Sequence, residues 1–334
     1  MLILGIDTSC DDTSIAVIEY NVNERKFAIL SNIISSQVKA HVEYGGIVPE
    51  IASREHLKNI TAVFTMAVNK AGVKANELDL IAVTAGPGLS GSLIVGYCFA
   101  KGVAIANKKP YITVDHIKAH TAANFMEPYA IEYPAVALTI SGGHSSLAVL
   151  KSPIDVNFIG GTIDDAVGEL FDKTARYLNL AYPGGPILDK MSREGRPCYK
   201  LPKPLINEDN YNFSFSGLKT AVINFTRLNK DFEIKHLACS MTRCICDIFT
   251  KKIGAAVKSY GAKTILLSGG VACNSMIRES ISELGARKKI AVSMPPPVLC
   301  TDNGVMIAIL GTLDYLYSGG KNSKNTDVYP SSRW

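Results

Sequence analysis

A strand–turn–strand unit that occurs twice is the feature that most constrains the fold. Residues 2–19 contain a short apolar run, a turn of small polar residues and an alternating return segment. This order predicts two antiparallel strands joined by the turn. Residues 135–150 repeat the order, with the sequence Ser-Gly-Gly-His at the turn (141–144). The repetition indicates an internal duplication of one α/β unit.

Both turns offer hydroxyl groups and backbone N–H groups, which are the groups that hold phosphates. Two facing hairpins of this kind can hold a phosphate chain between them, as in the actin-like (ASKHA, RNase H-like) superfamily of sugar kinases and ATPases. A third strand and turn, at 264–271, leads to a helix at Asn274, where such folds commonly receive a purine and its ribose. We therefore predict an α/β, actin-like, two-lobed fold with duplicated β-hairpin and helix units.

A length of 334 residues is enough for two domains with proper cores. We expect an N-terminal actin-like lobe over 1–115 and a C-terminal lobe over 116–302, with a helical insertion at about 164–240. The last helix, about 303–317, is expected to pack back on the N-terminal lobe. Residues 318–334 are rich in Gly, Ser and Asn, which predicts a loose tail.

Composition excludes some classes of protein and permits others. Apolar residues make up 47% and charged residues 19%, as in a soluble globular protein. The net charge of +5 permits a nucleic-acid partner, but the basic residues are scattered. The eight cysteines contain no C-x2-C pair, no signal peptide opens the chain, and no apolar run reaches membrane-spanning length. We expect a cytoplasmic protein with reduced thiols and no membrane partner.

His116 and His120 are the strongest candidates for metal ligands. Residues four apart share one face of a helix, so both imidazoles can point at one ion. The glutamate that a zinc peptidase places after its first histidine is absent. Any nucleophile and third ligand must therefore come from elsewhere in the chain. A surface pair or a core-lining pair remains an alternative.

Several aspartates have two possible roles each. Asp11 and Asp12, with Asp7, could simply solvate a turn, or they could coordinate a metal and order water beside a nucleotide. Asp302 could cap the last helix or supply an oxygen ligand to the histidine pair. Asp189 follows a Pro-Gly-Gly loop and could cap a helix or accept hydrogen bonds from both hydroxyls of a ribose.

Ten motifs occur together and in order, and in combination they resemble the bacterial TsaD branch of the Gcp/OSGEP family. The resemblance covers about residues 2–312. The motifs occupy residues 5–13, 44–56, 85–91, the pair 116 and 120, 141–144, 164–173, 182–186, 213–219, 268–274 and 300–304.

The resemblance implies an activity and a metal site. Members of this family transfer a threonylcarbamoyl group from threonylcarbamoyl-AMP to N6 of the adenosine beside the anticodon in tRNAs that read ANN codons, which forms t6A. It implies one divalent metal per subunit, Fe²⁺ or alternatively Zn²⁺, held by His116, His120 and Asp302. The implied partners are tRNA, a TsaB-like silent paralogue and a TsaE-like ATPase.

The resemblance also implies which residues bind the adenine nucleotide of the donor. The matched positions are Thr139, Ile140, Ser141, Gly142, Gly143, Asp172, Gly185, Asp189 and Asn274. Asp11 and Asp12 are candidates for the catalytic base that takes a proton from the tRNA amine. The chain has Asp7 and Asp12 where the family commonly has glutamate, which shortens the reach by about one methylene. Cys273 stands where alanine is usual.

Three other functions are compatible with parts of the sequence. An actin-like ATPase or kinase would share the fold without needing the histidine pair. A metallopeptidase would use the pair but would need the missing glutamate. A non-catalytic partner would resemble the silent paralogue, which should have lost the metal ligands.

Overall fold

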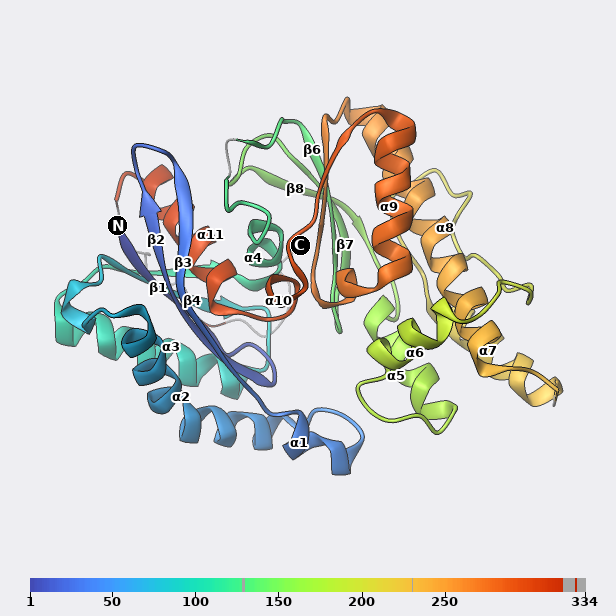
Figure 1. The fold of residues 1–334 in the computed structure, drawn as a ribbon, viewed down its shortest axis with the longest axis horizontal. Coiled ribbons are helices and arrows are strands. Elements are labelled where there is room, and N and C mark those ends of the chain that lie inside the picture. Colours follow the sequence, from blue (N-terminus) through green and yellow to red (C-terminus); the bar gives the residue numbers. More distant parts are fainter. Residues whose placement is uncertain (128–129, 230, 321–327, 329–334) are drawn as a thin grey trace. The chain divides into compact units, whose positions relative to one another are not determined.

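The computed structural model describes residues 1–127, 130–229, 231–320 and 328, and the chain divides into two compact units (Figure 1). Unit 1 comprises Met1–Ile131 and Asp302–Trp334, and unit 2 comprises Glu132–Thr301. The first division falls after Ile131, whereas the sequence led us to expect it after residue 115. The difference arises because the helix that follows residue 115 packs on the last helix and on a strand of unit 1.

Unit 1 is built on a five-stranded sheet with the order β3-β2-β1-β4-β5. β1 is antiparallel to β2, which is antiparallel to β3, whereas β4 and β5 run parallel to β1. The strands are β1 (Leu2–Asp7), β2 (Asp12–Asn21), β3 (Lys26–Ser36), β4 (Leu80–Gly86) and β5 (Tyr111–Asp115).

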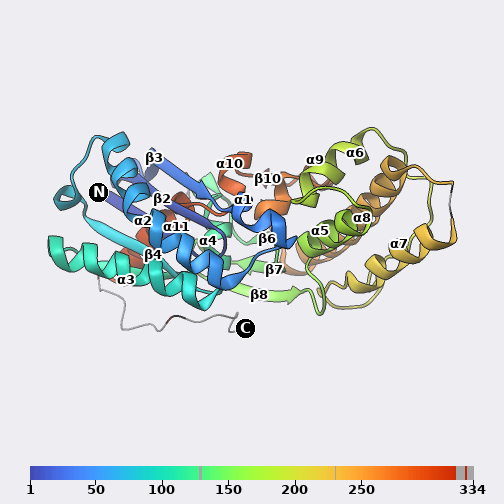
Figure 2. The ribbon, with the colours of Figure 1, turned by 90° about the horizontal axis from the view of Figure 1, so that it is seen from below.

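Helices cover both faces of this sheet. α2 (Pro49–Ala71) and α3 (Ser90–Asn107) lie side by side and pack on the face that carries Leu4 and Ile6 (Figure 2). α11 (Gly304–Tyr317) packs on the opposite face, where alternation along β1 places Gly5. Among the described residues, unit 1 also has α1 (Val38–His41), η1 (Val42–Tyr44), η2 (Ala75–Glu77) and α4 (His116–Ala122).

Unit 2 has a five-stranded sheet of the order β10-β9-β6-β7-β8. β6 pairs antiparallel with β7 and parallel with β9, as β1 does with β2 and β4 in unit 1. The duplication predicted from the two hairpins is therefore confirmed by the strand order. The strands are β6 (Ala135–Ile140), β7 (Ser145–Leu150), β8 (Val156–Gly161), β9 (Thr264–Ser268) and β10 (Ala291–Ser293).

The helices of unit 2 enclose a large hydrophobic core. Phe213 and Phe215 directly precede α7 (Ser216–Leu228) in the chain and pack against Phe249 of the long helix α8 (Ile234–Tyr260), with ring centroids 5.2 and 5.8 Å away. The helices are α5 (Val167–Tyr177), α6 (Gly184–Arg193), α7 (Ser216–Leu228), α8 (Ile234–Tyr260), η4 (Gly270–Cys273), α9 (Ser275–Lys288) and α10 (Pro297–Cys300).

Two further observations concern the C-terminal tail and the character of the helices. Of the tail expected at 318–334, only 318–320 and 328 fall within the described residues. Among the described helices, none combines the length and the apolar character needed to cross a membrane.

Candidate functional site

α4 holds the two histidines in fixed positions at the end of β5. The Asp115 carboxylate caps the helix, because its Oδ1 accepts hydrogen bonds from the backbone N–H groups of Ile117 and Lys118, both at 3.0 Å. His116 is the first residue of the helix and His120 lies one turn later. The two imidazoles therefore lie on one side, with ring centroids 4.6 Å apart.

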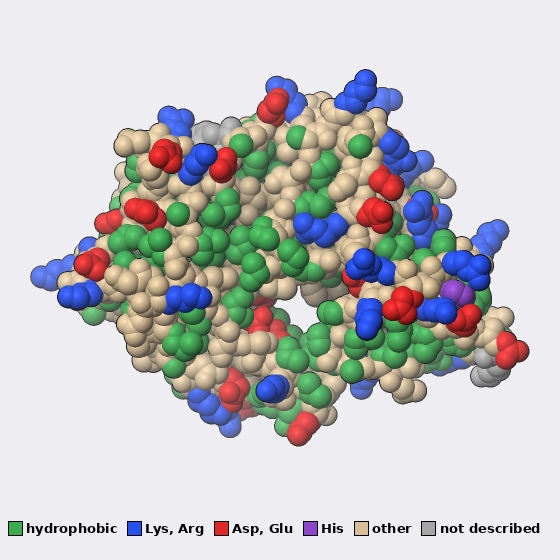
Figure 3. Space-filling model, in the orientation of Figure 1, with side chains coloured by type: hydrophobic (Ala, Val, Ile, Leu, Met, Phe, Trp, Pro, Cys, Tyr) green, Lys and Arg blue, Asp and Glu red, His purple; other side chains and the backbone are tan. Residues whose placement is uncertain are grey.

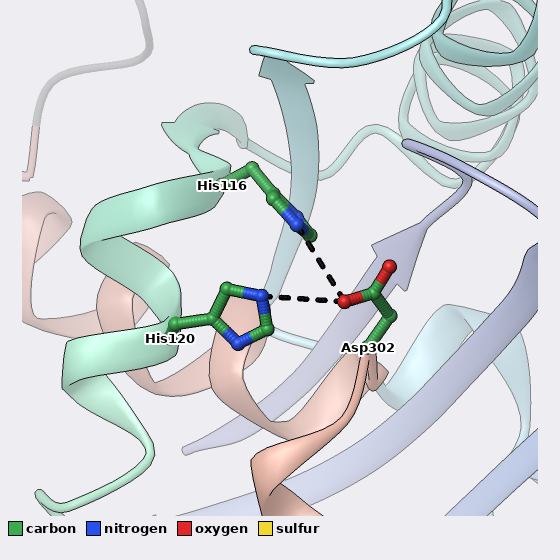
Figure 4. A group of neighbouring side chains, drawn as sticks. All are labelled: His116, His120 and Asp302. Carbon is green, nitrogen blue, oxygen red and sulfur yellow. Dashed lines mark ion pairs between the residues drawn. The ribbon is translucent and has the colours of Figure 1, made fainter. Parts of the chain in front are cut away.

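Asp302 faces both histidines within unit 1 (Figure 4). Its Oδ1 lies 3.6 Å from His116 Nε2 and 3.2 Å from His120 Nε2. One ligand atom from each residue lies within 4.8 Å of the others. The histidine side chains are 8% and 0% exposed, whereas that of Asp302 is 21% exposed.

The three side chains fit a divalent metal. Metal–nitrogen and metal–oxygen bonds of about 2.1 Å put neighbouring ligand atoms roughly 3.0–3.4 Å apart, close to the two separations found here. Both ring nitrogens of His120 and Nδ1 of His116 are buried without a hydrogen-bond partner among the described residues. Of these nitrogens, His120 Nε2 faces Asp302, and a cation bound there would satisfy this atom, which is otherwise costly to bury. Three protein ligands also leave positions for substrate.

Asp7 orients the His116 ring. Its side chain is fully buried, its Oδ1 accepts a 2.7 Å hydrogen bond from the Thr84 hydroxyl, and its Oδ2 lies 3.6 Å from His116 Nδ1. This leaves Nε2 of the ring directed at Asp302, a common arrangement around metal-binding histidines. Burial lowers the pKa of His116, but the carboxylates of Asp7 and Asp302 outweigh it and raise that pKa to about 9. The site therefore attracts positive charge.

Asp11 and Asp12 lie at the β1–β2 turn, beside the candidate metal site. Burial raises the pKa of Asp12 to about 7; a hydrogen bond with Ser36 opposes this rise, and the charges of Asp11 and Asp302 add to it. Burial and Asp302 also raise the pKa of Asp11. Asp12 Oδ1 is buried and has no hydrogen-bond partner among the described residues. Such a carboxyl can take up and release a proton near neutral pH.

His56 fixes this turn, a role that the sequence analysis did not assign. Its Nε2 donates to the Cys10 carbonyl at 3.0 Å, so its Nδ1 accepts from the Thr13 hydroxyl at 2.7 Å. The side chain is fully buried in α2, and burial lowers its pKa, which keeps the ring neutral. The sequence offered no signal for this role, because the contacting residues lie 43 and 46 positions away.

Unit 2 contains a cavity of about 310 Å³ that opens among four helices and the β6–β7 turn. Five of the nine residues predicted to bind the nucleotide line it: Gly142, Asp172, Gly185, Asp189 and Asn274. Seven further residues line the cavity and were not expected from the sequence to contact a ligand: Gly168, Phe171, Pro183, Pro186, Gly270, Val271 and Cys273. Most of these supply backbone or apolar surface, for which a sequence gives no chemical signal.

The three polar residues of the cavity wall also hold its framework. Asp172 Oδ1 accepts from Gly184 N at 2.8 Å, and burial raises the pKa of this carboxyl. Asp189 Oδ1 accepts from the backbone N–H and the hydroxyl of Ser275, at 3.0 and 2.9 Å. The side chain of Asn274 caps α9. Each therefore retains a structural role beside any ligand contact.

Four of the predicted nucleotide residues lie outside the cavity lining. Thr139 is buried, with its hydroxyl 3.1 Å from that of Ser268, and Ile140 is fully buried in β6. Ser141 closes the turn, because its N–H donates to the His144 carbonyl at 2.8 Å. Gly143 is exposed at the tip of the turn.

Sequence comparison places the chain close to proteins of one activity. The family model described as tRNA N6-adenosine threonylcarbamoyltransferase (TsaD) matches residues 28–309. A protein of that name from Trichlorobacter lovleyi is 45% identical, over 98% of this chain and 95% of its own length. One from Fusobacterium nucleatum is 46% identical, over 97% and 93%.

Solved structures with little sequence identity share the fold. HypF from T. kodakarensis matches with a TM-score of 0.62 at 16% identity, over 95% of this chain and 48% of its own. Component A of the (R)-2-hydroxyglutaryl-CoA dehydratase of Acidaminococcus fermentans gives 0.58 at 12%, over 95% and 99%. A ROK hexokinase from Thermus thermophilus gives 0.53 at 13%, over 95% and 100%. The actin-like fold class predicted from the sequence is confirmed.

Proposed function

Because the chain belongs to the tRNA N6-adenosine threonylcarbamoyltransferase family, we propose that it transfers the threonylcarbamoyl group of threonylcarbamoyl-AMP to a tRNA adenosine. The acceptor is N6 of the adenosine next to the anticodon in tRNAs that read ANN codons, the product is t6A, and AMP leaves. The observation that carries the proposal is the convergence of His116, His120 and Asp302 in a member of this family.

The donor is a mixed anhydride, so its carbamoyl carbon already carries a good leaving group. A divalent metal at the triad, Fe²⁺ or Zn²⁺, one per subunit, would supply Lewis acidity toward the oxygens of the threonylcarbamoyl group. His116 and His120 would hold such an ion in their neutral forms, and Asp7 would keep the His116 ring turned toward it. Asp302, the most exposed of the three ligands, marks the side open to substrate.

Asp12 is the residue that we assign to the proton of the attacking amine. An exocyclic adenine amine is a weak nucleophile, so removal of its proton and accurate positioning supply much of the rate. The unpartnered Oδ1 of Asp12 and a pKa of about 7 suit a carboxyl that accepts this proton. Asp11, whose pKa burial also raises, is the alternative base.

The cavity of unit 2 is the site that we assign to the adenosine of the donor. Ser275 occupies Oδ1 of Asp189, which leaves Oδ2 to accept from the hydroxyls of a ribose. Phe171 and Val271 contribute apolar surface for the purine, and the backbone of Gly142 borders the same space. A cavity of about 310 Å³ is at the small end of the range for ligand sites.

Charge favours unit 2 as the part that contributes more to tRNA binding. Residues 132–301 contain 21 of the 35 Lys and Arg side chains but 15 of the 30 Asp and Glu side chains. Figure 3 shows basic side chains gathered on the part of this face formed by α7, α8 and α9, with acidic ones among them. Lys and Arg neutralise phosphates without reading sequence. This moderate excess suits a tRNA surface shared with TsaB-like and TsaE-like partners in the cytoplasm.

A reconstitution tests the function. The purified chain, supplied with its partners, a divalent metal, threonylcarbamoyl-AMP and unmodified tRNA, should form t6A that mass spectrometry of the digested tRNA detects. The same mixture with ATP and sugars, or with peptides, tests kinase and peptidase activity. Absence of t6A with the full partner set would contradict the proposal.

A further inference from the structure

An exposed tyrosine lies on a short segment that follows the sheet of unit 1. The segment, residues 37–47, begins directly after β3 and contains α1 and η1. It carries two large apolar side chains that are exposed, Val42 at 49% and Tyr44 at 56%. The Tyr44 side chain has no hydrogen bond or ring contact with any other described residue. Its ring is therefore open to a ligand.

The segment starts beside the residue that we assign as the base. Ser36, the last residue of β3, pairs with Asp12 in the sheet, and the Gln37 N–H donates to the Asp11 carbonyl at 3.0 Å. The four residues of α1 rise about 1.5 Å each and the three of η1 about 2.0 Å each, so the Tyr44 backbone lies within about 12 Å of this start. A nucleotide beside the acceptor adenosine is therefore the part of the proposed substrate that would meet this ring.

His41 closes the segment at its base. The His41 side chain is fully buried, and its Nδ1 accepts from the backbone N–H of Val48 at 3.3 Å. Its Nε2 therefore donates to the Gln37 side-chain oxygen, also at 3.3 Å. The Gln37 side-chain nitrogen in turn donates to the Ala52 carbonyl of α2 at 3.3 Å. The backbone that carries Tyr44 is thus ordered before a ligand binds, which lowers the entropic cost of binding.

The composition of the segment favours a single flat ligand over a protein surface. Exposed charged residues interrupt the apolar ones along the chain: Lys39 and Glu43 in the segment, and Glu50 and Arg54 at the start of α2. A stable protein interface instead needs contiguous apolar area. Lys39 and Glu43 bear opposite charges, so attraction to phosphate contributes little. Stacking on the Tyr44 ring remains, and unpaired bases of single-stranded RNA bind aromatic side chains in this way.

We propose that Tyr44 stacks on an unpaired base of the tRNA anticodon loop beside the acceptor adenosine, and so positions that adenosine at the β1–β2 turn. The inference rests on the proposed function, from which it takes the substrate. Tyr44 touches none of the reacting atoms, so it is a substrate-positioning residue. A base held on its ring restricts where the neighbouring N6 amine can lie relative to Asp12, and such positioning matters for a weak nucleophile.

The experiment compares Tyr44→Ala with Tyr44→Phe in the full chain assembled with its partners. The KM for unmodified tRNA is measured at saturating threonylcarbamoyl-AMP, and the equilibrium affinity for the same tRNA is measured without the donor. Tyr44→Ala should raise KM and weaken the affinity about tenfold, as expected for one lost base stack, whereas Tyr44→Phe keeps the wild-type values. The ratio of wild-type to Tyr44→Ala affinity should be the same at low and high salt, because no charge is removed.

Tyr317→Ala is the matched control. Tyr317 is 50% exposed at the end of α11, also in unit 1, and its loss should leave the KM for tRNA unchanged. Bound metal, AMP affinity and affinity for the TsaB-like and TsaE-like partners should equal those of the wild type in all three variants.

Any of three results would overturn the proposal. The first is that Tyr44→Ala binds tRNA as tightly as the wild type. The second is that Tyr44→Phe loses as much affinity as Tyr44→Ala, which would assign the effect to the hydroxyl group. The third is that Tyr44→Ala loses a protein partner, which would make the segment a protein-docking surface. If the wild-type assembly binds tRNA but forms no t6A, the proposed function fails, and the affinities alone still decide whether Tyr44 stacks on RNA.

Discussion

Units 1 and 2 share one strand order but have different chemistry at corresponding turns. The β1–β2 turn of unit 1 carries Cys10 and Asp11, next to Asp7 at the end of β1, whereas the β6–β7 turn of unit 2 carries the sequence Ser-Gly-Gly-His. The acidic turn lies beside a metal candidate, and the glycine turn borders a cavity. The duplicated sheet therefore sets where the two turns lie, while the turns and the helices that follow supply different chemical groups in the two units.

The centres of the two sheets differ as well. Gly5 of β1 pairs with Ala16 and Ala82, whereas the corresponding position of β6, Leu138, pairs with Leu147 and Leu267. The small residues Gly5, Ala16 and Ala82 let α11 approach the sheet closely, because a Cβ on Gly5 would lie 2.0 Å from the Gly304 carbonyl oxygen. The three leucines instead fill the core of unit 2.

The largest effect should come from removing one side chain of the candidate metal site in unit 1. His120→Ala removes a ligand and should lower t6A formation on the order of 10³-fold, because a metal supplies several kcal/mol to charge stabilisation. Bound metal, measured by elemental analysis, should fall with it, while AMP affinity stays unchanged. His236→Ala, a histidine change in unit 2, should keep its metal. Loss of AMP binding in His120→Ala would contradict the division of roles.

The stability of the protein should depend in opposite ways on side-chain size at Leu138 and at Gly5. Leu138→Ala leaves a cavity and should destabilise the protein by about 2–5 kcal/mol. Gly5→Ala adds a single carbon and should still cost about 1–3 kcal/mol, because α11 must move. Denaturant unfolding measures both.

A matched control exists for the glycine change. Gly102→Ala adds the same carbon in α3, where nothing lies within 4 Å, and should be neutral or stabilising by up to about 1 kcal/mol. If Gly5→Ala is as well tolerated as Gly102→Ala, close packing of α11 is not what distinguishes unit 1.

A substitution in unit 2 should weaken nucleotide binding without changing the amount of bound metal. Asp189→Asn keeps an acceptor for Ser275 but loses the charge, and should weaken AMP binding by roughly 10–100-fold. Ser275→Ala removes only the hydroxyl contact with Asp189 and controls for its structural role. Equal losses in these two variants would assign Asp189 to holding α9 rather than to the ligand.

The smallest effect concerns pH and α11. Burial raises the pKa of Asp314 to about 6; Lys118 opposes this rise and Asp115 adds to it. A folded-state pKa above the unfolded value means that the folded protein holds the proton longer. Stability contributed by this group is therefore present below about pH 4 and lost as pH rises to about 6.

Asp314→Asn removes this dependence, and the wild type should be the less stable protein at pH 7. The difference should be on the order of 1–2 kcal/mol after discounting for partial exposure, and it should vanish near pH 3. Unfolding free energies of both proteins at several pH values measure it. A difference that does not change with pH would show that Asp314 titrates normally.

The sequence was informative where periodicity and turn chemistry act locally. The two hairpins predicted the duplicated strand order, and the spacing of His116 and His120 predicted a shared helix face, which the structure shows. The approach of Asp302 to them could not be worked out from local pattern, because it depends on how the chain returns to unit 1. The family resemblance supplied Asp302 as a candidate ligand.

Other features depend on contacts that no local pattern encodes. The assignment of α4 to unit 1 follows from its packing on α11, nearly 190 residues later in the chain. Phe171 looks like any core residue of an amphipathic helix, yet it also lines the cavity. The hydrogen bond from His56 to the Cys10 carbonyl in the β1–β2 turn likewise forms only when α2 packs on the sheet.

Single-turnover t6A formation, measured as metal is returned to chelator-treated protein, tests the central assignment most directly. With partners, donor and tRNA in excess, the rate should rise with added Fe²⁺ or Zn²⁺ and level off at one ion per chain. AMP binding to unit 2 should be the same before and after the metal is added. A full rate in the metal-free protein, or the same metal titration in His120→Ala, would contradict the assignment of acyl transfer to the His116, His120 and Asp302 site.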